Sequence, residues 1–136
     1  MIAATTMSSI EGRKDIEWRE LKYNEVLKEV ESGDNSAKTK LAWLKLSGLG
    51  GAEVDEDGAV ELLEERVKEG DGDAMWMLGV CYEFGFGVEQ DIEQAEILYK
   101  VSSEKGNEIG KFFVSHGEDE RGSGKMWMMD SLWMKQ

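Results

Sequence analysis

Apolar side chains recur at helical spacing along most of the chain, and glycines separate the apolar segments. The spacing predicts one helix over residues 15–32, which Gly33 ends in a left-handed conformation. It predicts a second helix over 37–47, and a third over 55–69 that Gly70 closes. The chain has no proline to interrupt these helices.

The same pattern then returns at a fixed distance. Gly33, Gly70 and Gly106 lie 37 and 36 positions apart, and one inserted residue in the first turn explains the change of offset. Other identical pairs at these offsets are Ala37 and Ala74, Leu41 and Leu78, Gly48 and Gly85, Asp55 and Asp91, Ala59 and Ala95, and Leu62 and Leu98. A period of this length is typical of solenoids. The sequence therefore predicts an all-α fold, a short helix–turn–helix solenoid in which small alanines let antiparallel helices approach closely.

The clearest copy, residues 74–106, resembles the Sel-1-like repeat, a relative of the tetratricopeptide repeat. The matching positions are Ala74, Leu78, Gly79, Tyr82, Gly85, Gly87, Val88, Asp91, Ala95, Tyr99, Ser102, Ser103 and Gly106. Ser102 and Ser103 stand where the family usually has two alanines, and residues 37–70 match less closely. The resemblance implies an α-solenoid that acts as a non-catalytic adaptor holding other proteins.

The predicted organisation is one α-solenoid domain over 14–136, after a leader or added segment over 1–13. Residues 10–13 spell a protease recognition site used in expression vectors, so they are left out of the fold prediction. The domain divides into a leading helix (14–36), repeat 1 (37–73), repeat 2 (74–109), and a degraded repeat with a C-terminal capping helix (110–136).

The end of the chain, residues 125–135, is apolar around nearly the whole helix circumference. A helix of this kind is buried or available to a partner. Folding onto the open end of the array as a cap is the simpler interpretation, because a short solenoid needs one. Self-association through its methionines and tryptophans, giving a homo-oligomer, is the alternative.

The formal net charge is −13, and no basic stripe is present to neutralise phosphates. Nucleic acid and anionic membranes are therefore disfavoured as partners. A peptide or protein with basic flanks would be steered toward the chain, although an acidic surface also serves solubility. Cys81 is the single cysteine, so no intrachain disulfide can form, and we expect a reducing, cytoplasmic compartment.

Residues that could carry chemistry are few. Cys81 falls on the packing face, and His116 is the single histidine, so neither a nucleophile nor a zinc cluster is expected. Residues 53–64 have the spacing of a calcium loop, but Ala59 and Leu62 recur as packing residues in repeat 2. The acidic run more simply favours the start of a helix. We therefore expect neither catalysis, metal nor cofactor.

One side of the first helix in each repeat is left over after packing, and in this repeat class the first helices line the concave surface. At the repeat offsets Trp76 aligns with Thr39 and Phe112, Val80 aligns with Trp43 and His116, and Glu83 aligns with Asp119. The predicted partner-binding residues are Thr39, Trp43, Trp76, Val80, Glu83, Phe112, His116 and Asp119.

These residues form a ladder of apolar and aromatic side chains edged by carboxylates, which suits a peptide with apolar anchors and basic flanks. The open alternative is that Trp43, Trp76 and Phe112 pack against neighbouring helices or the tail. The predicted function is a non-catalytic adaptor that binds a partner on its concave face. A self-associating module built on the C-terminal helix is the alternative.

Overall fold

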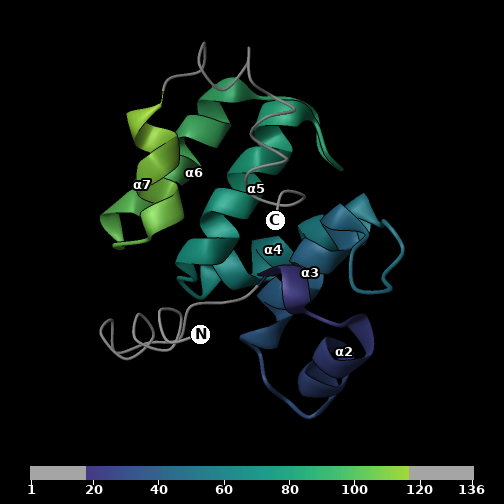
Figure 1. The fold of residues 1–136 in the computed structure, drawn as a ribbon. Coiled ribbons are helices and arrows are strands. Elements are labelled where there is room, and N and C mark those ends of the chain that lie inside the picture. The colour runs from purple at the N-terminus through teal and green to yellow at the C-terminus, as the bar shows by residue number, and fades with distance from the viewer. Residues whose placement is uncertain (1–17, 117–136) are drawn as a thin grey trace.

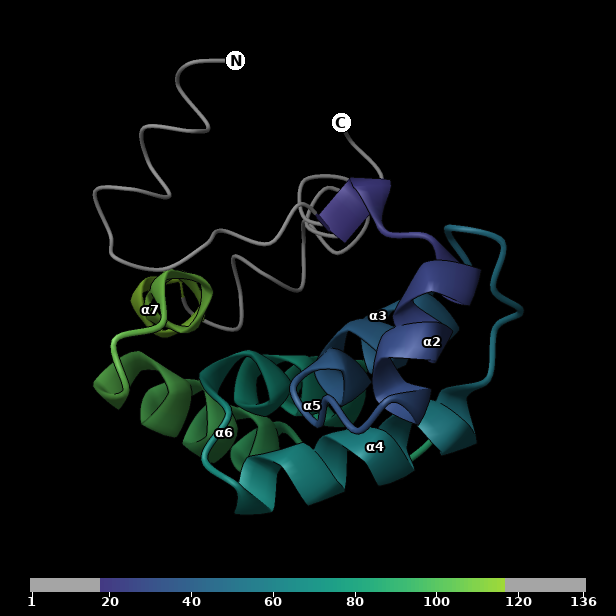
Figure 2. The same ribbon diagram turned by 90° about the horizontal axis from the view of Figure 1, so that it is seen from below.

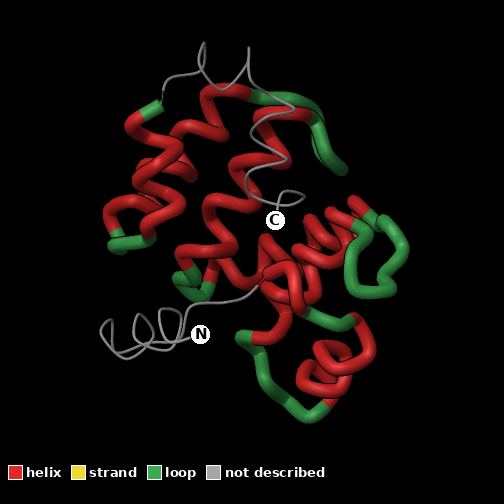
Figure 3. The backbone as a smooth tube through the Cα atoms, in the orientation of Figure 1, coloured by secondary structure: helices red, strands yellow, loops and turns green. Residues whose placement is uncertain are grey.

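Helices separated by glycine-containing turns make up the computed structural model, which describes residues 18–116 (Figures 1 and 3). The elements of this part are the 3₁₀ turn η1 (Trp18–Glu20) and the helices α2 (Tyr23–Glu31), α3 (Ala37–Ser47), α4 (Glu56–Lys68), α5 (Gly72–Phe84), α6 (Ile92–Glu104) and α7 (Glu108–Ser115). Residues 18–116 contain no strand, so the predicted all-α fold is confirmed. The leader, the C-terminal segment and Asp119 lie outside the described residues.

Each helix packs on its neighbours in the chain, so α3 with α4 and α5 with α6 form two hairpins. The hairpins stack so that α5 contacts α3, α4 and α7. In Figure 2, α4 and α6 lie along one side of the array, while α7 and η1 lie on the other. This is the arrangement of a short solenoid, in which contacts run between successive elements. No helix of residues 18–116 is long and apolar enough to cross a membrane.

Periodic polar residues begin the helices. Asp55, Asp91 and Asn107 each accept a hydrogen bond from a backbone N–H three residues further on, at 3.0, 3.2 and 2.9 Å. These side chains satisfy N–H groups that the first helical turn leaves without a partner in the helix. The acidic run after Asp55 therefore begins a helix, as predicted. The Gly58 N–H and Lys45 both lower the pKa of the Asp55 carboxyl.

Small side chains lie where the helices approach each other. The four repeated alanines are fully buried, as predicted: Ala37, Ala59, Ala74 and Ala95. Gly79 allows a close approach, because a Cβ atom there would lie 2.6 Å from Cε1 of Tyr99 on α6. Packing of two helices at this distance requires that one of them contribute almost no side chain.

The predicted leading helix over 15–32 is wrong in its first part. The chain forms η1, passes through Lys22 in an extended conformation, and begins α2 at Tyr23. The reason is a contact far along the sequence: Tyr23 N donates to Gly50 O at 2.8 Å. Gly50 has a positive φ of 66°, and any Cβ there would collide with the Leu21 carbonyl oxygen. In an uninterrupted helix the Tyr23 N–H would donate to a carbonyl oxygen four residues earlier in the same helix. Because it donates to Gly50 instead, the helix is interrupted before Tyr23.

Candidate protein-binding surface

A row of aromatic rings crosses the three helices α3, α5 and α7. Trp76 on α5 stacks on Phe113 of α7 with ring centroids 6.1 Å apart. Trp18 of η1 lies 5.6 Å from Trp43 of α3 and meets Trp76 edge-on at 6.3 Å. These spacings are those of favourable aromatic pairs. We call the following set the aromatic row: Trp43, Trp18, Trp76, Phe113, Phe112 and His116.

Carboxylates at the start of α5 hold this row in place. Asp73 Oδ1 accepts hydrogen bonds from Trp76 Nε1 at 3.0 Å and from Asn107 Nδ2 at 2.8 Å. Thr39, one repeat before Trp76, donates its hydroxyl to Asp71 Oδ2 at 2.6 Å. The aligned positions 39 and 76 therefore each bind an aspartate that belongs to the junction between successive repeats. The hydrogen bond to Asp73 fixes the orientation of the Trp76 indole.

Five of the predicted binding residues are almost completely buried. Their exposed fractions are 0% for Trp43, 1% for Trp76, and 2% for Thr39, Val80 and Glu83. The expectation that the fold does not need this side of the helices differs from the structure, because other parts of the protein cover it. Trp18 and Phe113 are two of the covering groups. Binding of a partner by these residues stays a prediction.

Glu83 serves the packing of α5 against α6. Its Oε1 accepts a hydrogen bond from the hydroxyl of Tyr99 at 2.7 Å, and its backbone oxygen accepts one from Gln90 Nε2 at 2.7 Å. The Tyr99 ring in turn stacks on Phe113 with centroids 4.3 Å apart. A buried carboxylate requires such donors to offset lost hydration. Its predicted role in reading positive charge on a partner stays a prediction.

Phe112 and His116 form the half-buried end of the row. Their ring centroids lie 4.0 Å apart. His116 Nδ1 lies 2.9 Å from the carbonyl oxygen of Phe112, an acceptor, so this nitrogen carries the proton of the hydrogen bond. The two rings therefore present one fixed aromatic surface at the end of α7.

Sequence reasoning missed two members of the row. They are Trp18 and Phe113: the repeat offset aligns Phe112 with Trp76, whereas Phe113 makes the stacking contact. The sequence holds no signal that Trp18 covers Trp43 and Trp76, because that contact depends on how η1 lies on the folded repeats. Phe113 (1% exposed) follows Met77 (0%) at the same offset of 36, so it occupies the position of a buried packing residue.

Groups with catalytic potential are buried or engaged in structure. Cys81 is fully buried on the packing side, as predicted. Burial raises the pKa of its thiol to about 12, and the charge of Glu56 adds to that shift. The thiolate nucleophile is therefore scarce at neutral pH. Within residues 18–116, no group of three or more His, Cys, Asp or Glu side chains is placed to hold a metal ion.

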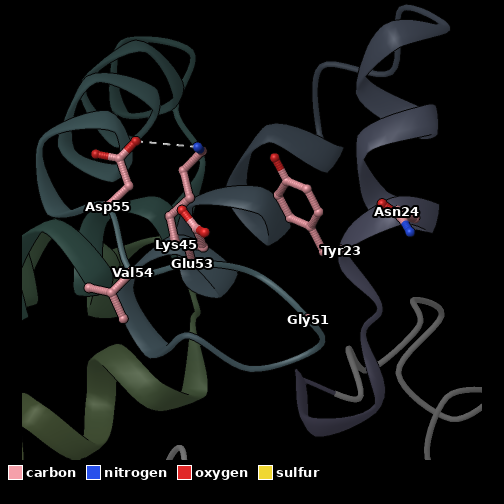
Figure 4. Close-up of a pocket in the computed structure, with 7 residues that line it drawn as sticks. All are labelled: Tyr23, Asn24, Lys45, Gly51, Glu53, Val54 and Asp55. Atoms are coloured by element: carbon pink, nitrogen blue, oxygen red, sulfur yellow. Dashed lines mark hydrogen bonds and ion pairs between the residues drawn. The ribbon is translucent and has the colours of Figure 1, made fainter.

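A separate pocket of about 530 Å³ lies between the start of α2 and the loop that joins α3 to α4 (Figure 4). Its lining residues are Tyr23, Asn24, Lys45, Gly51, Glu53, Val54 and Asp55. Lys45 Nζ lies 3.4 Å from Asp55 Oδ2, so the lysine is paired with a residue of the pocket wall. None of the lining residues belongs to the aromatic row.

Stacked helix–turn–helix hairpins with periodic caps define the class of fold as a short α-solenoid. The family model described as Sel1 repeat matches residues 35–65 and 72–107. The chain therefore belongs to the Sel1 repeat family, as its sequence pattern predicted. Sel1 repeats generally mediate protein–protein interactions, and proteins built from them are typically non-catalytic.

A solved structure supports the fold independently. The crystal structure of a Sel1 repeat protein from Oxalobacter formigenes superimposes with a TM-score of 0.62 at 23% sequence identity. The match covers 99% of this chain and 57% of that one. It shows the shared fold.

Two curated relatives match part of the chain. They are DAP3-binding cell death enhancer 1 from Rattus norvegicus, 36% identical over 55 residues, and the protein of the same name from Mus musculus, 34% identical over 55 residues. Each match covers 40% of this chain and 11% of the relative, so the chain spans a small part of their length. By their name, those relatives bind DAP3.

Proposed function

We propose that this chain is a non-catalytic module that binds a partner protein or peptide on the inner face formed by α3, α5 and α7. The observation that carries the proposal is the aromatic row, which crosses all three helices without interruption. Aromatic side chains dominate the energetics of protein interfaces because they bury a large area at small entropic cost. The family's general role and the name of the two curated relatives support the same class of function.

The proposed contact begins at the half-buried end of the row. Phe112 and His116 are half-buried, whereas Trp43 and Trp76 lie beneath other side chains. A partner would place an apolar or aromatic anchor against Phe112. The net charge of −13 favours partners with basic residues beside that anchor, through long-range attraction.

The test uses peptides selected from a random displayed library on the full chain, with Kd measured by fluorescence anisotropy. Phe112→Ala removes a half-buried ring and is expected to weaken the selected peptides by about tenfold or more. Val114→Ala is the matched control, because Val114 lies on the same helix and is 51% exposed. This control should leave Kd within about twofold. A tenfold change in Kd, as expected for Phe112→Ala, corresponds to about 1.4 kcal/mol of binding free energy.

Both variants should keep the helical circular dichroism of the wild type. Failure to select any peptide would count against the proposal. So would peptides that bind Phe112→Ala as tightly as the wild type.

A further inference from the structure

Trp18 fills the junction between the two repeats on the inner face. Its ring lies 5.6 Å from Trp43, which belongs to the first hairpin, and 6.3 Å from Trp76, which belongs to the second. Both contacted indoles are almost completely buried, whereas Trp18 is half-buried. One side chain thus covers two indoles that the repeats place next to each other.

The segment that carries Trp18 is not part of either repeat. It is a three-residue 3₁₀ turn, and Lys22 leads from it to α2 in an extended conformation. The nearest helix is attached instead to the turn after α3, through the hydrogen bond from Tyr23 N to Gly50 O. A short 3₁₀ turn has little stability of its own, so Trp18 holds its position largely through contacts of its side chain. This is how the anchor residue of a bound peptide sits on a preformed surface.

We infer that the Trp43–Trp76 junction is a recognition slot for a tryptophan side chain, and that Trp18 occupies it within the same chain. A partner peptide that presents a tryptophan therefore competes with the leading segment of this protein. The inference rests on the proposed function and adds to it a second anchor site on the inner face, together with the side chain that fits it. The slot orients an indole by one tilted and one edge-on aromatic contact, at interplanar angles of 41° and 84°.

Competition within the chain sets the direction of the expected effect. A tethered occupant acts at an effective concentration in about the millimolar range. A free peptide must displace it, so its apparent affinity for the wild type is reduced. Removing Trp18 removes the competitor while leaving both walls of the slot, Trp43 and Trp76, in place.

The experiment uses a fluorescent peptide of residues 14–22, KDIEWRELK, added to the full chain. Trp18→Ala is expected to bind this peptide at least about tenfold more tightly than the wild type, and Trp18→Phe to fall between them. Glu20→Ala is the matched control, since Glu20 is exposed on the same turn, and it should bind as the wild type does. The peptide with alanine in place of its tryptophan should bind none of the variants.

Several outcomes would overturn the inference. One is that the peptide binds neither Trp18→Ala nor Trp18→Phe although both keep wild-type helicity; another is equal binding to wild type and Trp18→Ala. A concentration-dependent dimer of the wild type that Trp18→Ala abolishes would assign the slot to a second copy's Trp18 instead.

Failure of the inference and failure of the proposed function can be told apart. If library-selected peptides depend on Phe112 but not on the identity of residue 18, the inner face binds partners and the inferred slot is wrong. If Trp18→Ala binds the tryptophan peptide while Phe112→Ala changes no partner's affinity, the slot binds tryptophan and the proposed contact at Phe112 is wrong.

Discussion

At the scale of single residues, the two repeats pack their first helix against their second with different combinations of side-chain size. Repeat 2 has Gly79 on α5 facing Tyr99 of α6, with almost no space between them. At the equivalent positions repeat 1 has Ala42 and Leu63, both fully buried. A larger side chain on the second helix thus accompanies a smaller one on the first, as close packing of a protein interior requires.

Gly79→Ala should therefore destabilise the protein although alanine is the better helix former. The added Cβ would lie 2.6 Å from the Tyr99 ring, which also stacks on Phe113 at a centroid distance of 4.3 Å. Overpacking costs about 1–3 kcal/mol and helix propensity restores roughly 1 kcal/mol, so the free energy of unfolding in urea denaturation should fall by up to about 2 kcal/mol.

The control for this effect is the same substitution in a Tyr99→Leu background, which reproduces the size of Leu63. There Gly79→Ala should cost much less or should stabilise. An equal cost in the two backgrounds would show that the tyrosine ring is not the source of the strain.

At the scale of elements, the start of α5 ties three helices together. Asp71 Oδ1 accepts from the N–H groups of Asp73 and Ala74 at 2.9 and 3.3 Å, which caps α5. Its Oδ2 accepts from Thr39 of α3 at 2.6 Å and lies 3.5 Å from Arg66 Nε of α4. One carboxylate therefore joins a helix start to both helices of the preceding repeat.

Asp71→Ala should lower the free energy of unfolding by more than the loss of a helix cap alone would. We expect the free energy of unfolding to fall by about 2–4 kcal/mol, because the cap, the Thr39 bond and the Arg66 pair are lost together. Asp91→Ala removes the side chain that caps α6 through the Gln94 N–H at 3.2 Å, and should cost about 1 kcal/mol. Thermal unfolding followed by circular dichroism measures both, and equal losses would mean that Asp71 acts as a cap only.

The helices also differ in how well the sequence alone predicts them. Periodicity, caps and glycine spacing predict α3 to α6, because each of these signals acts within a few residues of the helix it shapes. The leading helix was predicted wrongly because its break depends on Gly50, far along the chain. A helical projection likewise identifies the side that carries Trp43 and Trp76, but it does not reveal that Trp18 covers them.

At the scale of the whole molecule, most exposed acidic side chains lie on other elements than the aromatic row, and Glu20 of η1 and Glu108 of α7 are exceptions. Exposed acidic residues cluster on α4 and α6, at Glu61, Glu64, Glu65, Glu93 and Glu96. The row lies on α3, α5 and α7 together with η1. Because most of the charges lie outside the proposed contact, they should mainly attract a basic partner at a distance and add little once it is bound.

Association with a basic-flanked partner should therefore depend on salt mainly through its rate. Between about 0.1 M and 1 M NaCl the screening length falls from about 10 Å to about 3 Å. Stopped-flow fluorescence with a selected peptide that carries lysines beside its anchor should show the association rate constant falling by about tenfold or more, with little change in the dissociation rate constant. The same peptide with alanines in place of the lysines should associate at a rate that hardly responds to salt. A salt effect carried instead by dissociation would place partner lysines in direct contact with carboxylates of the inner face, as the predicted roles of Glu83 and Asp119 require.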